Sequence, residues 1–172
     1  MTTSKAGRPY SKLMLFQRAL ALAASLWFAG FAAHAGDELP WFKASFLDLR
    51  EDISEARAAD KRLILYFNMV GCPFCKKLLE VNFADPAILA TMRKHFDLVA
   101  LDIHGAREVT WTDGKPRTEK ELAVFMKVRG TPTLMFLDED GNTALRIDGY
   151  YEPRKFRAAL HEAAQRQLKV KE

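Results

Sequence analysis

The sequence predicts one α/β domain, built on a mixed β-sheet with helices on both of its faces. Two short apolar runs, at residues 63–68 and 97–103, are typical of buried strands. A third strand pattern, at 133–137, is joined by a tight turn to a fourth at 143–147. Helical patterns separate these strands, so the predicted order is helix, strand, helix, strand, helix, strand, strand, helix.

The first half of the domain begins with a helix pattern. Segment 44–62 has apolar residues at the spacing of an amphipathic helix, namely Phe46, Leu49, Ile53 and Ala56. The strand "LILYFN" at 63–68 is followed by Gly71, the two cysteines of the chain and a helix start, "KKLLEVNF". Asp85 and Pro86 suit the N-cap and the first position of a further helix, which precedes the strand at 97–103.

Turn and capping signals organise the second half. The Asp-Gly pair at 113–114 predicts a small hairpin within residues 104–117. The sequence "TEKE" at 118–121 is a capping box, which predicts the start of a helix. The turn at 140–142 joins the last two strands. A closing helix then starts at Pro153, with apolar residues at Phe156, Leu160, Ala163 and Ala164.

The charge distribution argues against a nucleic-acid-binding protein. The chain has 26 basic and 22 acidic residues. Four of the basic residues lie in the first 35 positions, which contain no acid: Lys5, Arg8, Lys12 and Arg18. The rest of the chain therefore holds 22 residues of each sign. It has no basic excess to attract a phosphate backbone, so we expect no nucleic-acid partner.

The first 35 residues have the organisation of a secretory signal. The basic region ends at Arg18, an apolar run of 15 residues follows, and Ala33 and Ala35 are the small residues that a signal peptidase reads. The apolar run is shorter than the roughly 20 residues that cross a bilayer. We therefore expect a cleaved signal peptide at 1–35, one domain at 36–172, and export to the periplasm, where disulfides persist.

Cys72 and Cys75 allow three interpretations: a structural staple, half of a metal site or a redox couple. A disulfide across so short a loop stabilises a fold by only about 2 kcal/mol, which a domain with a full core hardly needs. A closed zinc site needs four ligands, and His95, His104 and His161 lie at no recurring ligand spacing. The redox couple is the favoured interpretation.

The local sequence supplies what a redox couple requires. Cys72 stands at the junction of strand and helix, where free backbone N–H groups and the positive helix end favour a thiolate. Pro73 fits the first helical position because it lacks an N–H group that would be unpaired there. Cys75 lies on the same face of the first turn, so we expect Cys72 to attack and Cys75 to resolve the mixed disulfide. Lys76 would add to thiolate stabilisation, although a solvated lysine is the more ordinary interpretation.

The strand "LILYFN", the motif "CPFC" and the sequence "GTPT" before a strand and hairpin resemble the thioredoxin superfamily across nearly all of residues 36–172. "GCPFCKKL", "TEKELAVFMKVRGTPTLMFLDEDGN" and "DGYYEP" resemble more closely the exported thioredoxin-like proteins of the SoxW type, which are associated with bacterial sulfur oxidation. The resemblance implies the thioredoxin fold. It also implies a thiol-disulfide oxidoreductase with no cofactor beyond its cysteine pair.

The resemblance also assigns site residues. Pro73 and Phe74 would form the dipeptide between the active-site cysteines. Pro132 would follow a cis peptide bond and pack beside them, where it tends to shield the sulfurs from metal. The backbone of Thr131 would pair with an extended substrate peptide.

Three features depart from the thioredoxin pattern. Tyr66 stands where thioredoxins carry a buried Asp, and Ala100 falls near the position of that residue's usual Lys partner. Gly71 replaces the Trp that usually precedes the first cysteine, and the dipeptide is Pro-Phe rather than Gly-Pro. Proton transfer to Cys75 therefore needs another route, such as water, and the reduction potential of thioredoxin is not transferable.

The likeness to the SoxW type favours a reductase. Such a protein would receive electrons from a membrane thiol transporter of the DsbD or CcdA type. It would pass them to a protein disulfide or to an oxidised sulfur-carrier cysteine, and we expect it to be a monomer. A DsbA-like oxidant is the alternative, because potentials of this fold span about −270 to −120 mV. A non-enzymatic chaperone for copper or a metallo-cofactor is a further alternative. Trp111, in the 104–117 segment, would either pack under its own hairpin or contact a partner.

Overall fold

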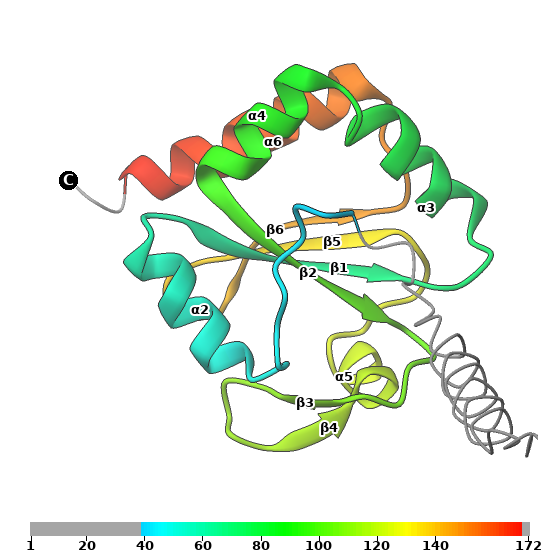
Figure 1. Ribbon diagram of the computed structural model, residues 1–172, viewed down its shortest axis with the longest axis vertical. Coiled ribbons are helices and arrows are strands. Elements are labelled where there is room, and N and C mark those ends of the chain that lie inside the picture. The colour runs from blue at the N-terminus through cyan, green and yellow to red at the C-terminus, as the bar shows by residue number, and fades with distance from the viewer. Residues whose placement is uncertain (1–38, 170–172) are drawn as a thin grey trace, which may run out of the picture. The chain divides into compact units, whose positions relative to one another are not determined.

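A four-stranded mixed sheet in the order β2-β1-β5-β6 lies at the centre of the computed structural model, which describes residues 39–169 (Figure 1). Strand β1 (Arg62–Asn68) pairs in parallel with β2 (Phe96–Asp102) and antiparallel with β5 (Thr133–Leu137). Strand β6 (Thr143–Asp148) completes a hairpin with β5. The sheet is therefore mixed, as the order of the sequence patterns predicts.

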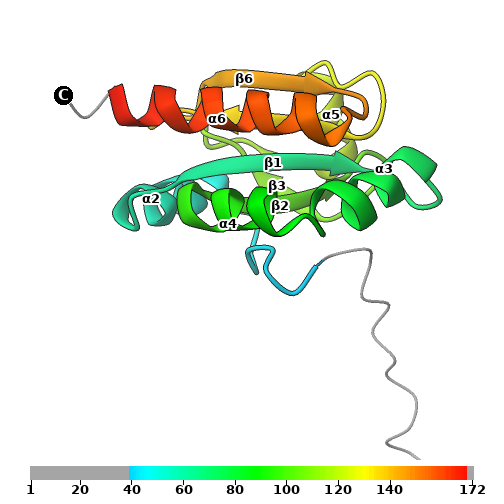
Figure 2. The same cartoon turned by 90° about the horizontal axis from the view of Figure 1, so that it is seen from above.

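Helices cover both faces of this sheet (Figures 1 and 2). Helices α3 (Pro73–Lys77), α4 (Pro86–His95) and α6 (Pro153–Lys169) contribute to one core, and α2 (Leu49–Ala58) and α5 (Glu119–Phe125) to the other. Successive β1 residues point to opposite faces, so this strand supplies Ile64 and Tyr66 to the first core and Leu63, Leu65 and Phe67 to the second. We call the first the cysteine-side core because both cysteines belong to it.

The helices begin where the capping residues predict. The Asp85 carboxylate accepts hydrogen bonds from the N–H groups of Ala87 and Ile88, at 2.9 and 3.1 Å, with Pro86 at the first helical position. At the start of α5, Thr118 and Glu121 form both halves of the capping box. A five-residue π-helix, η1 (Leu78–Asn82), continues α3, and the sequence pattern does not reveal it.

The expected place of Phe46 on the apolar face of the first helix is wrong. Helix α2 starts only at Leu49, and the Phe46 side chain is fully exposed before it. The chain is held out of the helix at this point because the Leu47 carbonyl accepts a hydrogen bond from the Thr110 N–H at 2.8 Å, and Leu47 has a φ of 65°. Asp48 then caps the helix by accepting from the Arg50 N–H.

Both predicted hairpins are present. Strands β3 (Glu108–Thr110) and β4 (Pro116–Thr118) pair antiparallel across the turn at 113–114. Trp111 is buried in the core shared by α2 and α5, so it packs under its own hairpin. In the β5–β6 hairpin the turn contains Gly141 at a φ of 84°, a conformation that suits glycine.

The predicted signal peptide at 1–35 lies outside the described residues. Within residues 39–169, no helix is both long and apolar enough to cross a membrane.

Candidate active site

The end of β1 and the start of α3 position the two cysteines (Figure 1). After Asn68 the chain turns, with the Cys72 N–H donating to the Met69 carbonyl at 3.3 Å and Gly71 at a φ of 76°. A residue with a side chain rarely adopts that conformation, so glycine suits the turn. Cys72 is the N-cap of α3 and forms a disulfide with Cys75, with 5.2 Å between the two Cα atoms.

Two donors contact the sulfur of Cys72. The Cys75 N–H donates to it at 3.0 Å and the Thr131 hydroxyl at 3.2 Å. In the reduced protein both donors would stabilise a thiolate on Cys72 more than a thiol, together with the positive end of the helix. Both cysteines are largely buried, Cys75 at 3% exposure and Cys72 at 6%.

The predicted proline loop lies at the disulfide. The Thr131–Pro132 peptide bond is cis, as the resemblance implies, and the hydroxyl contact of Thr131 places this loop against Cys72. The Pro132 carbonyl accepts a hydrogen bond from the Gly149 N–H at 2.8 Å. This bond ties the proline loop to the segment between β6 and α6, so three separate segments meet at the disulfide.

An aromatic cluster beside the disulfide is not evident from the sequence patterns. Phe74 is 56% exposed and stacks on Tyr150, with 6.4 Å between the ring centroids. The Lys77 ammonium lies 4.4 Å from the centre of the Tyr150 ring and 3.1 Å from the Glu152 carboxylate. The motif "DGYYEP" contains Tyr150, but its contact with Phe74 cannot be predicted from local sequence because the two residues are far apart in the chain.

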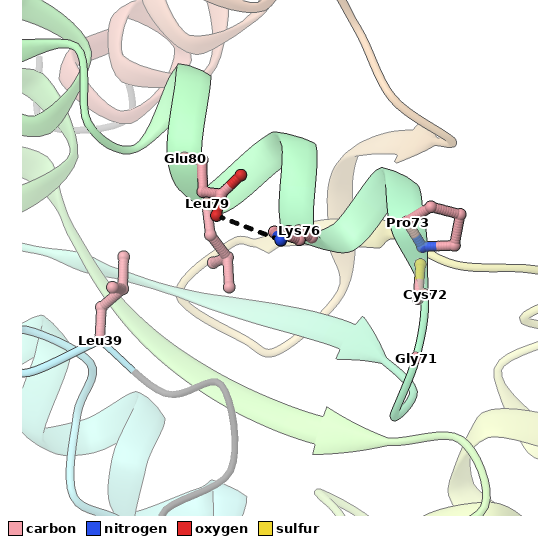
Figure 3. Close-up of a pocket in the computed structure, with 7 residues that line it drawn as sticks. All are labelled: Leu39, Gly71, Cys72, Pro73, Lys76, Leu79 and Glu80. Atoms are coloured by element: carbon pink, nitrogen blue, oxygen red, sulfur yellow. Dashed lines mark ion pairs between the residues drawn. The ribbon is translucent and has the colours of Figure 1, made fainter.

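A pocket of about 740 Å³ has Cys72 among its lining residues. Figure 3 shows Leu39 and Leu79 on either side of it. Lys76 also lines this pocket, and its ammonium lies 3.7 Å from Glu80, one turn along the helix (Figure 3). Because Lys76 is 72% exposed and already paired, it adds little to the electrostatics of the sulfur.

The departures from the thioredoxin pattern have a packing explanation. Tyr66 is buried at 1% exposure and makes edge-to-face contacts with Phe42 and Phe83, at centroid distances of 6.0 and 6.2 Å. Its neighbour on β2 is Ala100, whose small side chain leaves room for the ring. Among the described residues, the buried acidic side chains are Asp52 and Glu119, and they lie on α2 and α5, the helices that pack on the other core. The described part of the chain therefore offers no buried carboxylate on the side of Cys75 to take its proton.

Potential metal ligands do not gather into a cluster in the part of the chain that the structure describes. No group of three or more histidine, cysteine, aspartate or glutamate side chains within residues 39–169 could hold a metal ion. The three histidines considered from the sequence, His95, His104 and His161, therefore do not gather around the cysteine pair.

Comparison with known proteins agrees with this geometry. A family model described as a thioredoxin-like domain matches residues 49–164. The chain belongs to the thioredoxin-like family. With Cys72 and Cys75 close enough to form a disulfide, this thioredoxin-like protein is a thiol-disulfide oxidoreductase.

Curated relatives of the thioredoxin-like chain include the "Thiol:disulfide interchange protein DsbD" of two bacteria. The protein of Vibrio vulnificus (strain YJ016) is 28% identical over 140 residues, which cover 78% of this chain and 21% of that protein. The protein of Actinobacillus pleuropneumoniae serotype 5b (strain L20) is 28% identical over 114 residues, 65% of this chain and 18% of that protein. The chain thus spans about a fifth of the length of these relatives.

Solved structures share the thioredoxin-like fold. A thioredoxin from Thermus thermophilus superposes with a TM-score of 0.57 at 21% identity, covering 73% of this chain and 90% of that one. A putative disulphide-isomerase from Bacteroides thetaiotaomicron gives a TM-score of 0.52 at 24% identity, covering 67% of this chain and 84% of that one. At these identities the likeness concerns the fold alone.

Proposed function

We propose that this thioredoxin-like protein is an exported reductase of disulfides in other proteins. The observation that carries the direction is the set of donors at Cys72. Within the described residues, both groups that donate to its sulfur, the Cys75 N–H and the Thr131 hydroxyl, are neutral. A strong oxidant of this fold is oxidising because its reduced form is stabilised. Neutral donors alone stabilise a thiolate less than a cation does, which favours a reducing couple.

The exchange proceeds in two balanced steps from the dithiol form. The Cys72 thiolate attacks one sulfur of the substrate disulfide, that S–S bond breaks, and the released substrate thiolate takes up a proton. Cys75 then loses its proton to water and attacks the sulfur of Cys72 in the mixed disulfide. The second substrate thiol leaves, two electrons have passed to the substrate, and the protein holds the Cys72–Cys75 disulfide of the structure.

The roles of the remaining site residues belong to the same proposal. Pro73 begins α3 directly after Cys72, and Phe74 presents its exposed ring beside the disulfide. The hydroxyl of Thr131 donates a hydrogen bond to the Cys72 sulfur, and the backbone of Thr131, next to Pro132, pairs with the substrate peptide. The chemistry then requires no cofactor beyond the cysteine pair.

The cellular setting is inferred from the N-terminal pattern and the relatives. We propose a signal peptide at 1–35, a thioredoxin-like domain at 36–172 and a monomer working in the periplasm. Electrons would come from a membrane thiol transporter of the DsbD or CcdA type, and the relatives named as thiol:disulfide interchange proteins support such a partner. The SoxW likeness extends the substrates from protein disulfides to an oxidised sulfur-carrier cysteine.

The reduction potential tests the direction. The mature protein is equilibrated with mixtures of reduced and oxidised glutathione, and the dithiol fraction is counted by alkylation and mass spectrometry. We expect a potential nearer to the −270 mV of thioredoxin than to the roughly −120 mV of DsbA. The Cys75→Ser variant, which cannot form the internal disulfide, serves as the control for the dithiol count. A potential close to that of DsbA would instead identify an oxidant.

A further inference from the structure

A basic recess lies next to the proline loop. It has a volume of about 600 Å³, and its charged lining residues are three cations and one anion: Lys127, Arg129, Arg146 and Asp148. Gly130 and Thr131 also line it, and the Thr131 hydroxyl contacts the Cys72 sulfur. The recess is therefore adjacent to the reacting atom, although none of its cations contacts that sulfur.

The charges of this basic recess are unequally engaged. Arg146 donates to the carbonyls of Met126 and Lys127, each at 2.9 Å, and its Nε donates to both carboxylate oxygens of Asp148 at 2.9 and 3.0 Å. Asp148 is thus the counter-charge of Arg146. Among the described side chains, no acidic residue forms an ion pair or hydrogen bond with the ammonium of Lys127 or the guanidinium of Arg129. Two cations therefore remain for an incoming group.

The backbone beside these cations is also available. No backbone hydrogen bond joins Arg129 or Thr131 to another described segment, and the only bond to Gly130 comes from the Thr133 hydroxyl. An extended peptide that pairs with Thr131 would therefore run along this segment as an added strand. Arg129 is two residues from Thr131, which is about 7 Å along a strand. A substrate side chain two or three positions from its cysteine then reaches the recess.

We propose that the basic recess selects substrate segments that carry an aspartate or glutamate within three residues of the reacting cysteine. The carboxylate binds Lys127 and Arg129, while Arg146, already paired with Asp148, lines the same recess. This inference rests on the proposed function, because it concerns the peptide that the cysteine pair reduces. The surplus of positive charge favours a negatively charged side chain, because a neutral or basic side chain gains no attraction from the two unpaired cations.

The test uses matched peptides. Each contains one cysteine joined to 2-mercaptoethanol in a mixed disulfide, with Glu, Gln or Lys two residues before or after the cysteine. The protein is first reduced with dithiothreitol and freed of excess reductant, and the second-order rate constant for its single-turnover reduction of each peptide is measured. Hydroxyethyl disulfide serves as an uncharged reference substrate. In at least one of the two positions we expect the Glu peptide to be preferred over the Gln peptide by about two- to fivefold, with the Lys peptide slowest.

Reversing the charge of the two unpaired cations tests whether they cause the preference for acidic peptides. The double variant Lys127→Glu with Arg129→Glu should invert the ratio of the Glu to the Lys peptide. The matched control, Arg93→Glu with Lys94→Glu, changes the net charge equally on exposed positions of α4. These residues precede β2, at the opposite end of β1 from the cysteines, so the control should keep the wild-type ratio. Raising the salt to 1 M, where the Debye length is about 3 Å, should reduce the wild-type preference.

The outcomes distinguish loss of the acidic preference from loss of the reductase activity. Equal rates on the three peptides by a protein that reduces hydroxyethyl disulfide normally would overturn the acidic preference and leave the reductase standing. The same holds if the Lys127→Glu, Arg129→Glu variant, shown to be folded by its melting temperature, keeps the wild-type order. Failure of the wild-type protein to reduce hydroxyethyl disulfide would overturn both the reductase and the preference that rests on it.

Discussion

At the scale of single residues, the reactivity of Cys72 depends on groups from two segments. Helix α3 supplies the Cys75 N–H and the proline loop supplies the Thr131 hydroxyl. Neither group carries a formal charge. The ease with which the thiol ionises therefore depends on these two hydrogen bonds and on the positive end of the helix.

Asp48 offers a residue-scale prediction with a definite pH dependence. Its carboxylate accepts hydrogen bonds from the Arg50 side chain and backbone, and these lower the pKa of Asp48 to about 2. A lowered pKa stabilises the fold above the ordinary value of 3.8, and that stability is lost as the pH falls through about 2. Asp48→Ala should therefore lower the free energy of unfolding by about 1 kcal/mol at neutral pH, and the difference should shrink in acid.

Urea unfolding of wild type and Asp48→Ala, at neutral pH and at several acid pH values, measures this difference. Asp48→Asn is the matched control, because it keeps an N-cap acceptor but has no carboxylate to titrate. A difference between wild type and Asp48→Ala that is constant with pH would show that the negative charge of Asp48 does not contribute to stability.

Residue roles differ in how far sequence reveals them. Cys72, Pro73 and Cys75 lie within one turn of chain, so their geometry follows from local rules of helix starts. The stacking of Phe74 on Tyr150 joins positions far apart in sequence and depends on how two loops meet. Lys76 follows the same local rules, because its ion pair with Glu80, four residues on, arises from ordinary helical spacing.

At the scale of elements, the ends of helices were more predictable than their interiors. The caps at Asp85 and Thr118 lie where side-chain chemistry requires them. The π-helix after α3 has no sequence signature of that kind. Phe46 continues the apolar spacing of α2, yet it lies outside the helix because a contact with Thr110, from a distant strand, fixes Leu47.

Glu119 carries a prediction for the junction between β2, β3 and α5. Its carboxylate is 2% exposed, and it accepts hydrogen bonds from the Asp102 N–H at 3.0 Å, the Arg107 N–H at 3.3 Å and the Arg107 guanidinium at 2.7 Å. Glu119→Ala removes the shared acceptor of these three bonds, which leaves the Asp102 N–H unsatisfied, and should lower the free energy of unfolding by about 3 kcal/mol.

Denaturant unfolding tests the role of Glu119 against a neighbouring glutamate. Glu108 is exposed on β3, and Glu108→Ala should change the free energy of unfolding by no more than about 0.5 kcal/mol. If the two alanine variants lose equal stability, the buried carboxylate does not hold the junction together.

At the scale of the whole molecule, the central sheet separates two cores, and the disulfide belongs to only one of them. The mixed character of this sheet is predictable, since a hairpin follows the strand–helix–strand units. No local sequence pattern predicts the spatial strand order β2-β1-β5-β6. The order depends on which apolar faces pack together. From the sequence it could be expected only through the resemblance to the thioredoxin fold.

The stability of the two redox forms provides a whole-molecule prediction. A thermodynamic cycle links the reduction potential to the difference in folding free energy between the disulfide and dithiol forms. For the proposed reductase, the oxidised protein should melt at a higher temperature than the reduced protein. A DsbA-like oxidant shows the opposite order because its reduced form is stabilised, and the two extremes of potential differ by about 7 kcal/mol.

Calorimetry with and without a phosphine reductant compares the two forms. Cys75→Ser has no internal disulfide, so its melting temperature should not respond to the reductant. A reduced wild-type protein that melts above the oxidised one would contradict the reductase.

The glycine before the first cysteine has a consequence for the partners that can be served. A β-carbon at position 71 would meet no atom within 4 Å, so nothing stands over the chain there. A large aromatic side chain at this position would cover the approach to Cys72. With glycine there, we expect the proposed reductase to accept disulfides in surface loops of folded proteins, as well as those in unfolded chains.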